Sequence, residues 1–347
     1  MLPIFARSYD RFLLPVVARS YDRFLGHLLA PFVRRPARGL PQPARVSHSP
    51  EAVAWPAGVD LQWAGDDGDE LRQFQAPSPV DSPWPASRMM RGRALGAVDS
   101  RSAVIVLHGA SDNEYRYSEW MGREFAKQEY RVLVPAAPCH LDRAEPHTFS
   151  GAPLFWSPEL VVAGIAQWLA EVRGLIGWLR RQGVEMVGLV GYSLGSLVAG
   201  LAATLWNDLD FVALLAPVGH HLHAIHKSRV AAALWPWMRR IPPAQVRLLD
   251  RWAPLYRRPV VEHVLFLITL FDDLQPTELQ RAWWRAWNQP SHREYRHGHM
   301  SVLFSKQLYR DLEQLASSRR RSVVSGAHGR PADVSGSHLG QEDQPII

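Results

Sequence analysis

The stretch EMVGLVGYSLGSLVAGLAATLW, residues 185–206, decides the fold. An apolar run ending at Val190 leads into the motif GYSLG at 191–195, and a run of small and apolar residues follows. A serine flanked by glycines at such a junction predicts a tight turn from a buried strand into a helix. Side chains two residues to either side of Ser193 would collide in that turn, so Gly191 and Gly195 leave room for it.

Short apolar runs alternate with amphipathic helical patterns on both sides of this stretch, which is typical of buried parallel strands joined by helical crossovers. The predicted strands are 103–107, 131–135, 185–190, 211–216, 263–270 and 293–296. The predicted helices are 117–128, 158–182, 193–206, 277–287 and 301–316. Residues 70–77 and 87–95 are candidate antiparallel edge strands. The pattern predicts an α/β protein with a doubly wound, mostly parallel sheet and a small helical cap at about 218–260.

Ser193 is the candidate nucleophile, because it sits on the exposed turn; an ordinary helix N-cap is the alternative role. A serine hydroxyl needs a base, and the base needs an orienting carboxylate. Asp272 and Asp273 follow one predicted strand and His297 and His299 follow the last, in the order Ser, Asp, His. We favour Asp272, since Asp273 is better placed to cap the next helix, and we favour His299, which directly precedes a predicted helix.

Backbone N–H groups near the serine are expected to bind a developing oxyanion. Leu194 follows the nucleophile at a helix N-terminus, and its N–H points toward the charge that forms. His108-Gly109-Ala110 directly follows the first buried strand, where a second donor is required. We expect Ala110 and Leu194 to form the oxyanion hole.

These motifs together resemble the α/β-hydrolase superfamily over about 103–316, which implies the α/β-hydrolase fold and nucleophilic chemistry at a serine. More narrowly, the chain resembles the abhydrolase domain-containing 18 group. The narrower likeness rests on the Pro-x-His and Ser-Gly stretch at 138–151, the GHMS sequence at 298–301 and the basic N-terminal helix. The duplicated N-terminus departs from what we expect of that group.

Residues 2–13 recur almost unchanged as residues 14–25, a tandem repeat of 12 residues. The second copy continues to Phe32 with apolar residues at helical spacing, opposite Arg19, Asp22 and Arg23. We expect this helix to pack on the domain, with a membrane-surface helix as the alternative. The predicted organisation is an amphipathic N-terminal segment at 1–35, a catalytic domain at 36–316 and a disordered tail at 317–347.

Composition is that of an ordinary globular protein: 347 residues, 47% hydrophobic and 21% charged. The single cysteine, Cys139, cannot form an intramolecular disulfide, so a cytoplasmic location fits. Charges interrupt the apolar N-terminus, and we predict neither membrane insertion nor export. The net charge of +6 comes from few and peripheral basic clusters, so we expect no nucleic-acid binding. The sequence leaves the oligomeric state open.

In the run GHHLHAIH at 219–226, His220, His223 and His226 recur every third residue and could share one helix face, which raises the question of a metal site. The helical zinc motif needs histidines four residues apart with further ligands, and neither is present at typical spacing. We expect no metal and no cofactor.

The predicted function is hydrolysis of a carboxylic ester by a serine hydrolase with a Ser-His-Asp triad, through an acyl-enzyme. An acyltransferase or a thioester or amide hydrolase would use the same residues, and a non-catalytic binding protein of the same fold is a further alternative. A lipid ester is favoured, because tryptophans of the cap and a later helix could line an acyl pocket. These are Trp235, Trp237, Trp252, Trp283, Trp284 and Trp287.

Overall fold

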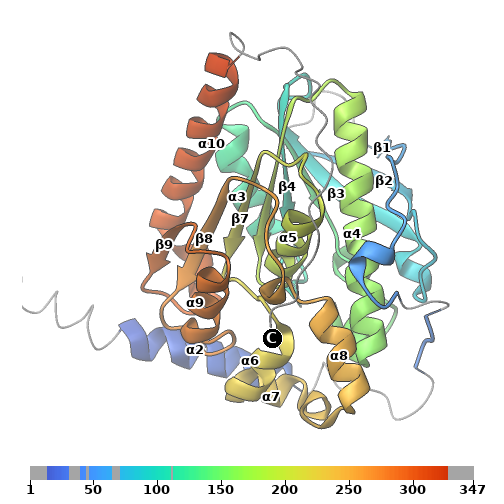
Figure 1. Ribbon diagram of the computed structural model, residues 1–347, viewed down its shortest axis with the longest axis vertical. Coiled ribbons are helices and arrows are strands. Elements are labelled where there is room, and N and C mark those ends of the chain that lie inside the picture. Colours follow the sequence, from blue (N-terminus) through green and yellow to red (C-terminus); the bar gives the residue numbers. More distant parts are fainter. Residues whose placement is uncertain (1–13, 31–39, 44–46, 65–70, 111, 327–347) are drawn as a thin grey trace, which may run out of the picture.

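A nine-stranded mixed sheet forms the centre of the molecule in the computed structural model (Figure 1). The structure describes residues 14–30, 40–43, 47–64, 71–110 and 112–326. The strand order is β1-β2-β3-β5-β4-β6-β7-β8-β9. The strands are β1 (Gln62–Ala64), β2 (Leu71–Pro77), β3 (Met89–Gly96), β4 (Ser102–Leu107), β5 (Arg131–Pro135), β6 (Met186–Tyr192), β7 (Phe211–Leu215), β8 (Val264–Thr269) and β9 (Ser291–Tyr295).

The first three strands pair antiparallel, as does β3 with β5, and all remaining pairs are parallel. Every residue of β4, β5, β6 and β7 is buried, since helices cover both faces of the sheet there. The predicted mostly parallel sheet is therefore confirmed, together with its two antiparallel edge strands. Strand β1 was not predicted, because its three residues are all exposed and carry no apolar alternation.

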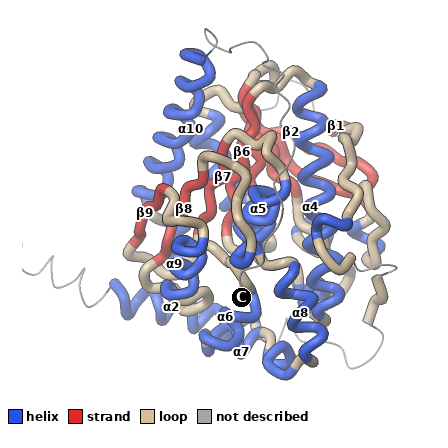
Figure 2. The backbone as a smooth tube through the Cα atoms, in the orientation of Figure 1, coloured by secondary structure: helices blue, strands red, loops and turns tan. Residues whose placement is uncertain are grey.

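Helices form a layer on each face of the sheet (Figures 1 and 2). The covering helices are α3 (Arg116–Ala126), α4 (Pro158–Arg181), α5 (Leu194–Leu205), α9 (Thr277–Ala286) and α10 (Lys306–Gly326). One core cluster joins α4, α5 and α9 to the sheet, and the other joins α3 and α10 to its opposite face. Neighbouring strand residues such as Val104 and Ile105 belong to different clusters, because strand side chains alternate between faces.

Helix α4 is long and apolar enough to cross a membrane by length and composition alone. In the structure, 78% of its most apolar window is buried inside the domain. Helix α4 is thus a helix of the protein core.

The segment between β7 and β8 is helical. It contains α6 (His221–Lys227), α7 (Arg229–Leu234), a 3₁₀ turn at Pro236–Arg240, α8 (Pro243–Arg251) and a 3₁₀ turn at Pro254–Tyr256. Helix α8 lies against α4, where Gln245 Nε2 donates to Glu159 Oε1 at 2.8 Å. These helices lie beyond the ends of β7 and β8 and so border the site described below (Figure 2).

The N-terminal helix α2 (Leu14–Leu29) packs on the domain, but through a face that we did not predict. Ala18, Asp22 and Gly26 are buried, whereas Tyr21 and Phe24 are exposed. The expectation that Asp22 would lie on the solvent face with the arginines was therefore wrong. Backbone N–H groups stabilise its buried carboxylate, as shown below.

Two further boundaries need correction. Helix α10 continues to Gly326, so the tail does not begin at residue 317; residues 327–347 lie outside the described part of the chain. The predicted helix 301–316 is divided into a 3₁₀ turn at Ser301–Phe304 and α10. The first repeat copy, residues 2–13, also lies outside the described residues.

Candidate active site

Ser193 stands between the end of β6 and the start of α5, in a backbone conformation with φ 53° and ψ −115°. This positive φ is uncommon for a residue with a side chain and indicates a strained turn. A Cβ at Gly191 would lie 2.3 Å from the carbonyl oxygen of Gly195, and a Cβ at Gly195 would lie 2.3 Å from that of Leu107. Both glycines are therefore required by the packing of the turn.

The structure brings Ser193, His299 and Asp272 into one hydrogen-bonded chain. Ser193 Oγ lies 2.8 Å from His299 Nε2, and His299 Nδ1 lies 2.8 Å from Asp272 Oδ2. All three side chains are buried. The residues come from the ends of β6, β8 and β9, and parallel strands bring their carboxyl ends to the same edge of the sheet.

A network of donors holds the carboxylate of Asp272. Its Oδ1 accepts the backbone N–H groups of Leu274 (2.9 Å) and Gln275 (2.6 Å). Its Oδ2 accepts from Thr269 Oγ1 (2.8 Å) and Gln280 Nε2 (3.0 Å) in addition to facing His299. These bonds fix the carboxylate in the orientation that binds the imidazole.

The pKa of His299 is raised above its usual value of 6.5. Burial of the imidazole by itself lowers the pKa, whereas Asp272 raises it through its charge and its hydrogen bond. Asp22 and Asp112 raise the pKa further through their charges. The environment therefore favours the imidazolium that forms when His299 accepts a proton.

The two competing candidates lie elsewhere. Asp273 does not cap α9, because the N-cap of that helix is Pro276. The carboxylate of Asp273 instead forms an ion pair with Arg23 Nε at 2.5 Å. The expected capping role of Asp273 was wrong because this pairing turns it toward α2. The carbonyl oxygen of His297 accepts a hydrogen bond from the backbone of Phe271, and its ring takes no part in the chain of hydrogen bonds to Ser193.

Ala110 and Leu194 line the same pocket as Ser193. Leu194 is the first residue of α5, and the first N–H groups of a helix have no acceptor within it. His108 supports the loop that carries Ala110: its Nε2 accepts from the backbone of Ala137 at 2.9 Å, and its Nδ1 therefore donates to the carbonyl of Gly109 at 2.7 Å. Burial, with the nearby His140, lowers the pKa of His108 to about 3, so this imidazole is neutral.

The stretch 138–151 that carried the family resemblance contacts this loop, since the ring centroids of His108 and His140 lie 5.0 Å apart. Arg143 and Glu171 form a bidentate ion pair at 2.7 Å, and both side chains are fully buried. Arg143 also donates to the carbonyl oxygens of Ala136 (2.6 Å) and Ser87 (2.8 Å). The pair thus ties the loop after β5 to helix α4.

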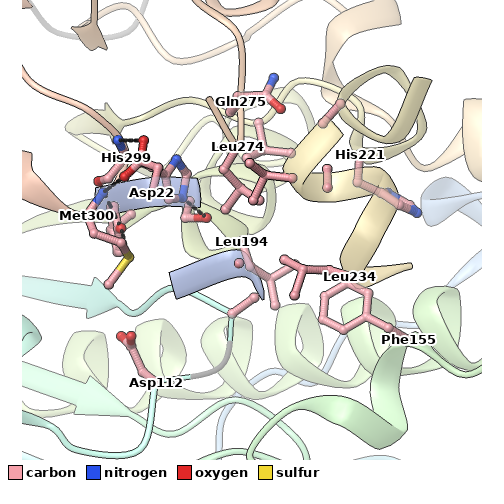
Figure 3. Close-up of a pocket in the computed structure, with 18 of the residues that line it drawn as sticks. Asp22, Asp112, Phe155, Leu194, His221, Leu234, Leu274, Gln275, His299 and Met300 are labelled. Carbon is pink, nitrogen blue, oxygen red and sulfur yellow. Dashed lines mark hydrogen bonds between the residues drawn. The ribbon is translucent and has the colours of Figure 1, made fainter. Parts of the chain in front are cut away.

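The pocket above Ser193 has a volume of about 320 Å³ and two chemically different ends. Its apolar residues include Phe149, Phe155, Val230, Leu234 and Trp235, and its polar residues include Asp112, Asn113, Glu114 and Arg116. Figure 3 shows Asp112 and Phe155 on either side of Leu194.

Asp112 carries a buried carboxylate at the polar end, where burial raises its pKa to about 7. Of the six tryptophans that we considered, Trp235 lines this pocket, whereas Trp252 and Trp283 are buried in the core.

Sequence reasoning missed Asp22, which lines the pocket from α2 (Figure 3). Its carboxylate accepts backbone N–H groups from the loops that carry His299 and Asp272. The available signal was an acidic residue close to Arg19 and Arg23 on a helix with many apolar residues. The amphipathic interpretation assigned Arg19, Asp22 and Arg23 to the solvent face.

The first histidine of the run, His220, has a structural role in the cap, whereas His221 lines the pocket above Ser193. His220 Nδ1 accepts from the backbone of Leu222 at 3.2 Å and so caps α6, while its Nε2 bonds Asp250 Oδ1 at 2.8 Å. Across the described residues, no group of three or more His, Cys, Asp and Glu side chains is arranged to hold a metal ion.

Comparisons with known proteins agree with this architecture. The family model "Alpha/beta hydrolase domain containing 18" matches residues 79–221. An uncharacterized protein of Mycobacterium tuberculosis is 27% identical over 195 residues, which are 52% of this chain and 44% of that protein. The chain therefore matches less than half the length of these curated relatives.

Solved structures show the same fold. The acetyl xylan esterase from Paenibacillus sp. R4 has a TM-score of 0.53 at 20% identity, covering 75% of this chain and 89% of the esterase. The acylaminoacyl peptidase of Pyrococcus horikoshii has a TM-score of 0.52 at 12% identity, covering 80% and 43%. The sheet, its covering helices and the serine turn are those of the α/β-hydrolase fold. Over residues 79–221 the chain resembles the alpha/beta hydrolase domain containing 18 family.

Proposed function

We propose that the protein is a serine hydrolase that cleaves a carboxylic ester through an acyl-enzyme intermediate. The observation that carries the proposal is the continuous hydrogen-bonded chain from Ser193 Oγ through His299 to Asp272, in a pocket large enough for a small ester. Such a chain activates a serine hydroxyl, which is a weak nucleophile at neutral pH.

In the proposed reaction, Ser193 Oγ attacks the ester carbonyl carbon while His299 Nε2 takes the hydroxyl proton. The N–H groups of Ala110 and Leu194 donate to the oxyanion of the tetrahedral intermediate. The intermediate expels the alcohol, which receives the proton from His299, and leaves an acyl-Ser193 ester. Water then attacks this ester with His299 as base, releasing the carboxylic acid and restoring the serine. Asp272 orients the imidazole throughout.

The acceptor and the leaving group distinguish this reaction from its alternatives. One structural neighbour is named an esterase and the other a peptidase, so the fold serves both ester and amide substrates. An acyltransferase would use the same Ser193, with an alcohol in place of water. A non-catalytic binding protein of this fold would not react with a fluorophosphonate, whereas the proposed hydrolase would be labelled at Ser193.

The division of the pocket supports a lipid ester as substrate. The rings of Phe155 and Trp235 lie 4.8 Å apart and form an apolar wall suited to an acyl chain. At the other end, Asp112 and Asn113 offer hydrogen-bonding groups to a polar alcohol. Faster hydrolysis of medium or long acyl esters than of acetate esters is the expected result, and a preference for acetate would contradict the lipid assignment.

The exposed face of α2 supports contact with a membrane surface. Val16 (61% exposed), Val17 (57%), Phe24 (63%) and Leu28 (51%) point outward from this helix. Arg19 and Arg23 flank them and suit anionic headgroups. We propose a cytoplasmic protein that binds membranes peripherally, with α2 placing the pocket close to its lipid substrate.

One experiment tests both parts of the proposal. The full chain, Ser193→Ala and Phe24→Ser are compared for fluorophosphonate labelling, ester hydrolysis and binding to phosphatidylglycerol vesicles at low and high salt. We expect Ser193→Ala to lose labelling and hydrolysis but still bind vesicles, and Phe24→Ser to bind vesicles more weakly while hydrolysing a soluble ester normally. Binding that salt does not weaken would contradict the electrostatic contribution.

A further inference from the structure

The buried face of α2 carries a carboxylate that contacts both loops of the candidate triad. Asp22 is 3% exposed. Its Oδ2 accepts the backbone N–H of His299 at 2.8 Å and that of Asp273 at 3.3 Å, and its Oδ1 accepts that of Met300 at 3.2 Å. Asp22 therefore joins the acid loop after β8 to the histidine loop after β9. Figure 3 shows Asp22 beside His299 and Met300.

The histidine loop is held from two directions. Tyr192 OH donates to the carbonyl oxygen of His299 at 3.1 Å from the side of β6, and Asp22 accepts the N–H of the same residue from the side of α2. Both backbone polar groups of His299 thus have fixed partners. The position of the imidazole depends on both anchors.

Close packing fixes the register of α2 against these loops. A Cβ at Gly298 would lie 2.7 Å from Asp22 Oδ2 and 3.0 Å from the carbonyl oxygen of Ala18. A Cβ at Gly26 would lie 2.3 Å from Val230 Cγ1 of helix α7. The helix therefore approaches the histidine loop as closely as a glycine allows.

Packing alone does not account for an aspartate at this position. Burying a carboxylate is costly unless hydrogen bonds offset its lost hydration, and an apolar side chain would dock the helix at lower cost. Burial, followed by the charge of Asp272, raises the pKa of Asp22 to about 6. The cost is offset at the point where the three backbone N–H groups of the triad loops converge.

We propose that Asp22 is a positioning residue, so that the Ser193-His299-Asp272 triad is complete only when helix α2 is docked. This inference rests on the proposed hydrolase function and adds the N-terminal helix to it. Asp22 acts through the loops and does not touch the reacting atoms.

Asp22 also contributes charge to the site. Its carboxylate helps to raise the pKa of His299, so its neutralisation lowers that pKa. Other charged groups lie on the elements around Asp22. They are Arg19 and Arg23 on α2, Lys227 and Arg229, which line a second cleft together with those arginines, Asp272 and Asp273 after β8, and Asp112, whose charge acts on His299. These groups are unchanged when only Asp22 is replaced by asparagine.

The test compares Asp22→Asn and Asp22→Ala with the wild-type chain, with steady-state kinetics on a soluble ester across pH. Asparagine keeps one carbonyl acceptor and removes the charge, whereas alanine removes all three hydrogen bonds. We expect kcat to fall about 100-fold in Asp22→Ala, as misplacement of a catalytic group does, and less in Asp22→Asn. We expect KM to change little and the acidic limb of the pH profile of Asp22→Asn to move to lower pH.

Two matched variants sharpen the result. Asp10→Asn changes the equivalent residue of the first repeat copy and should leave the kinetics unchanged. Gly298→Ala keeps the aspartate at position 22 but should still lower kcat. Its methyl group would lie 2.7 Å from Asp22 Oδ2 and would push α2 away from the histidine loop.

The outcomes are separable. Wild-type kcat in both Asp22 variants, an unmoved acidic limb in Asp22→Asn, or a loss in Asp10→Asn with none in Asp22→Asn would each overturn the inference. If Asp22→Ala does not fold by circular dichroism, Asp22→Asn decides. A wild-type chain that fluorophosphonate does not label would overturn the proposed function itself, whatever the Asp22 variants do.

Discussion

The carboxylate of Asp272 is the group whose replacement has the most sharply defined outcome. Its Oδ1 accepts two backbone N–H groups, from Leu274 and Gln275. Its Oδ2 faces His299 Nδ1 and accepts from Thr269 Oγ1 and Gln280 Nε2. In Asp272→Asn, one of these oxygens becomes an NH₂ donor. The effect on catalysis depends on which oxygen the amide nitrogen replaces.

The two orientations of the amide differ in free energy. With the NH₂ toward Leu274 and Gln275, two buried N–H groups lose their acceptor, at a cost of about 1–3 kcal/mol each. With the NH₂ toward His299, Gln280 Nε2 loses one acceptor but keeps the carbonyl oxygen of Gln275 at 2.7 Å. The Thr269 hydroxyl can rotate to accept, and the imidazole can accept at Nδ1 by taking the other tautomer. The second orientation costs less. It places a proton on Nε2, facing Ser193 Oγ, and the imidazole can no longer act as base.

We therefore expect Asp272→Asn to lower kcat/KM about 10,000-fold, as a wrong histidine tautomer does in such triads. That factor corresponds to about 5.5 kcal/mol of transition-state stabilisation. Asp273→Asn is the matched control. It removes ion pairs to Arg23 and Arg19, whose side chains are 62% and 49% exposed. Such exposed pairs contribute about 1 kcal/mol or less to stability, so we expect kcat/KM to fall about fivefold at most.

The assay is hydrolysis of a nitrophenyl ester by both variants, with circular dichroism melting to verify that each is folded. Equal losses in the two variants, or a larger loss in Asp273→Asn, would refute the assignment of Asp272 as the orienting acid. A loss in Asp272→Asn below about tenfold would refute the tautomer argument.

Three further predictions concern the nucleophile, the base and the buried ion pair. Ser193→Ala should abolish ester hydrolysis with an unchanged melting temperature, because it deletes one oxygen and removes no packing contact. Unfolding in circular dichroism would show a structural role. The acidic limb of the kcat/KM profile should lie above pH 6.5, since the base must be neutral and the pKa of His299 is raised; a limb below that pH would contradict this environment. Arg143→Met should lower the free energy of unfolding by about 3–5 kcal/mol in urea titration, because it leaves the Glu171 carboxylate buried without its partner. Adding Glu171→Leu should recover most of that loss, and an equal loss in the double variant would refute the charge argument.

Local sequence patterns were sufficient to predict most of the sheet. The runs at β4, β5, β6 and β7 are continuous and mostly apolar because both faces of these strands are covered. Such runs can be recognised without knowing which strands are neighbours in the sheet. The motif GYSLG located the serine turn for the same reason: its glycines are required by atoms within a few residues of Ser193 and by the neighbouring strand β4. Order along the chain then indicated which acid and which histidine to consider.

Choosing between neighbouring candidates needed the tertiary structure. Asp272 and Asp273 are adjacent in sequence, and the contacts that separate their roles come from His299 and from the N-terminal arginines, more than 20 residues away in each case. The same holds for Asp22, whose hydrogen-bond partners lie 251 to 278 positions later in the chain. Helical periodicity assigned Asp22 to the solvent because amphipathic patterns report side-chain polarity and not the backbone N–H groups that a docked loop presents.

The sequence by itself thus determined the α/β architecture and the nucleophilic turn, because both follow from burial and sterics over short distances. Only the tertiary structure decided that α2 docks through Ala18, Asp22 and Gly26 and leaves Val16, Val17, Phe24 and Leu28 exposed. The physical reason is that a carboxylate can be buried wherever enough N–H donors converge on it, and that convergence exists only once distant loops have folded together.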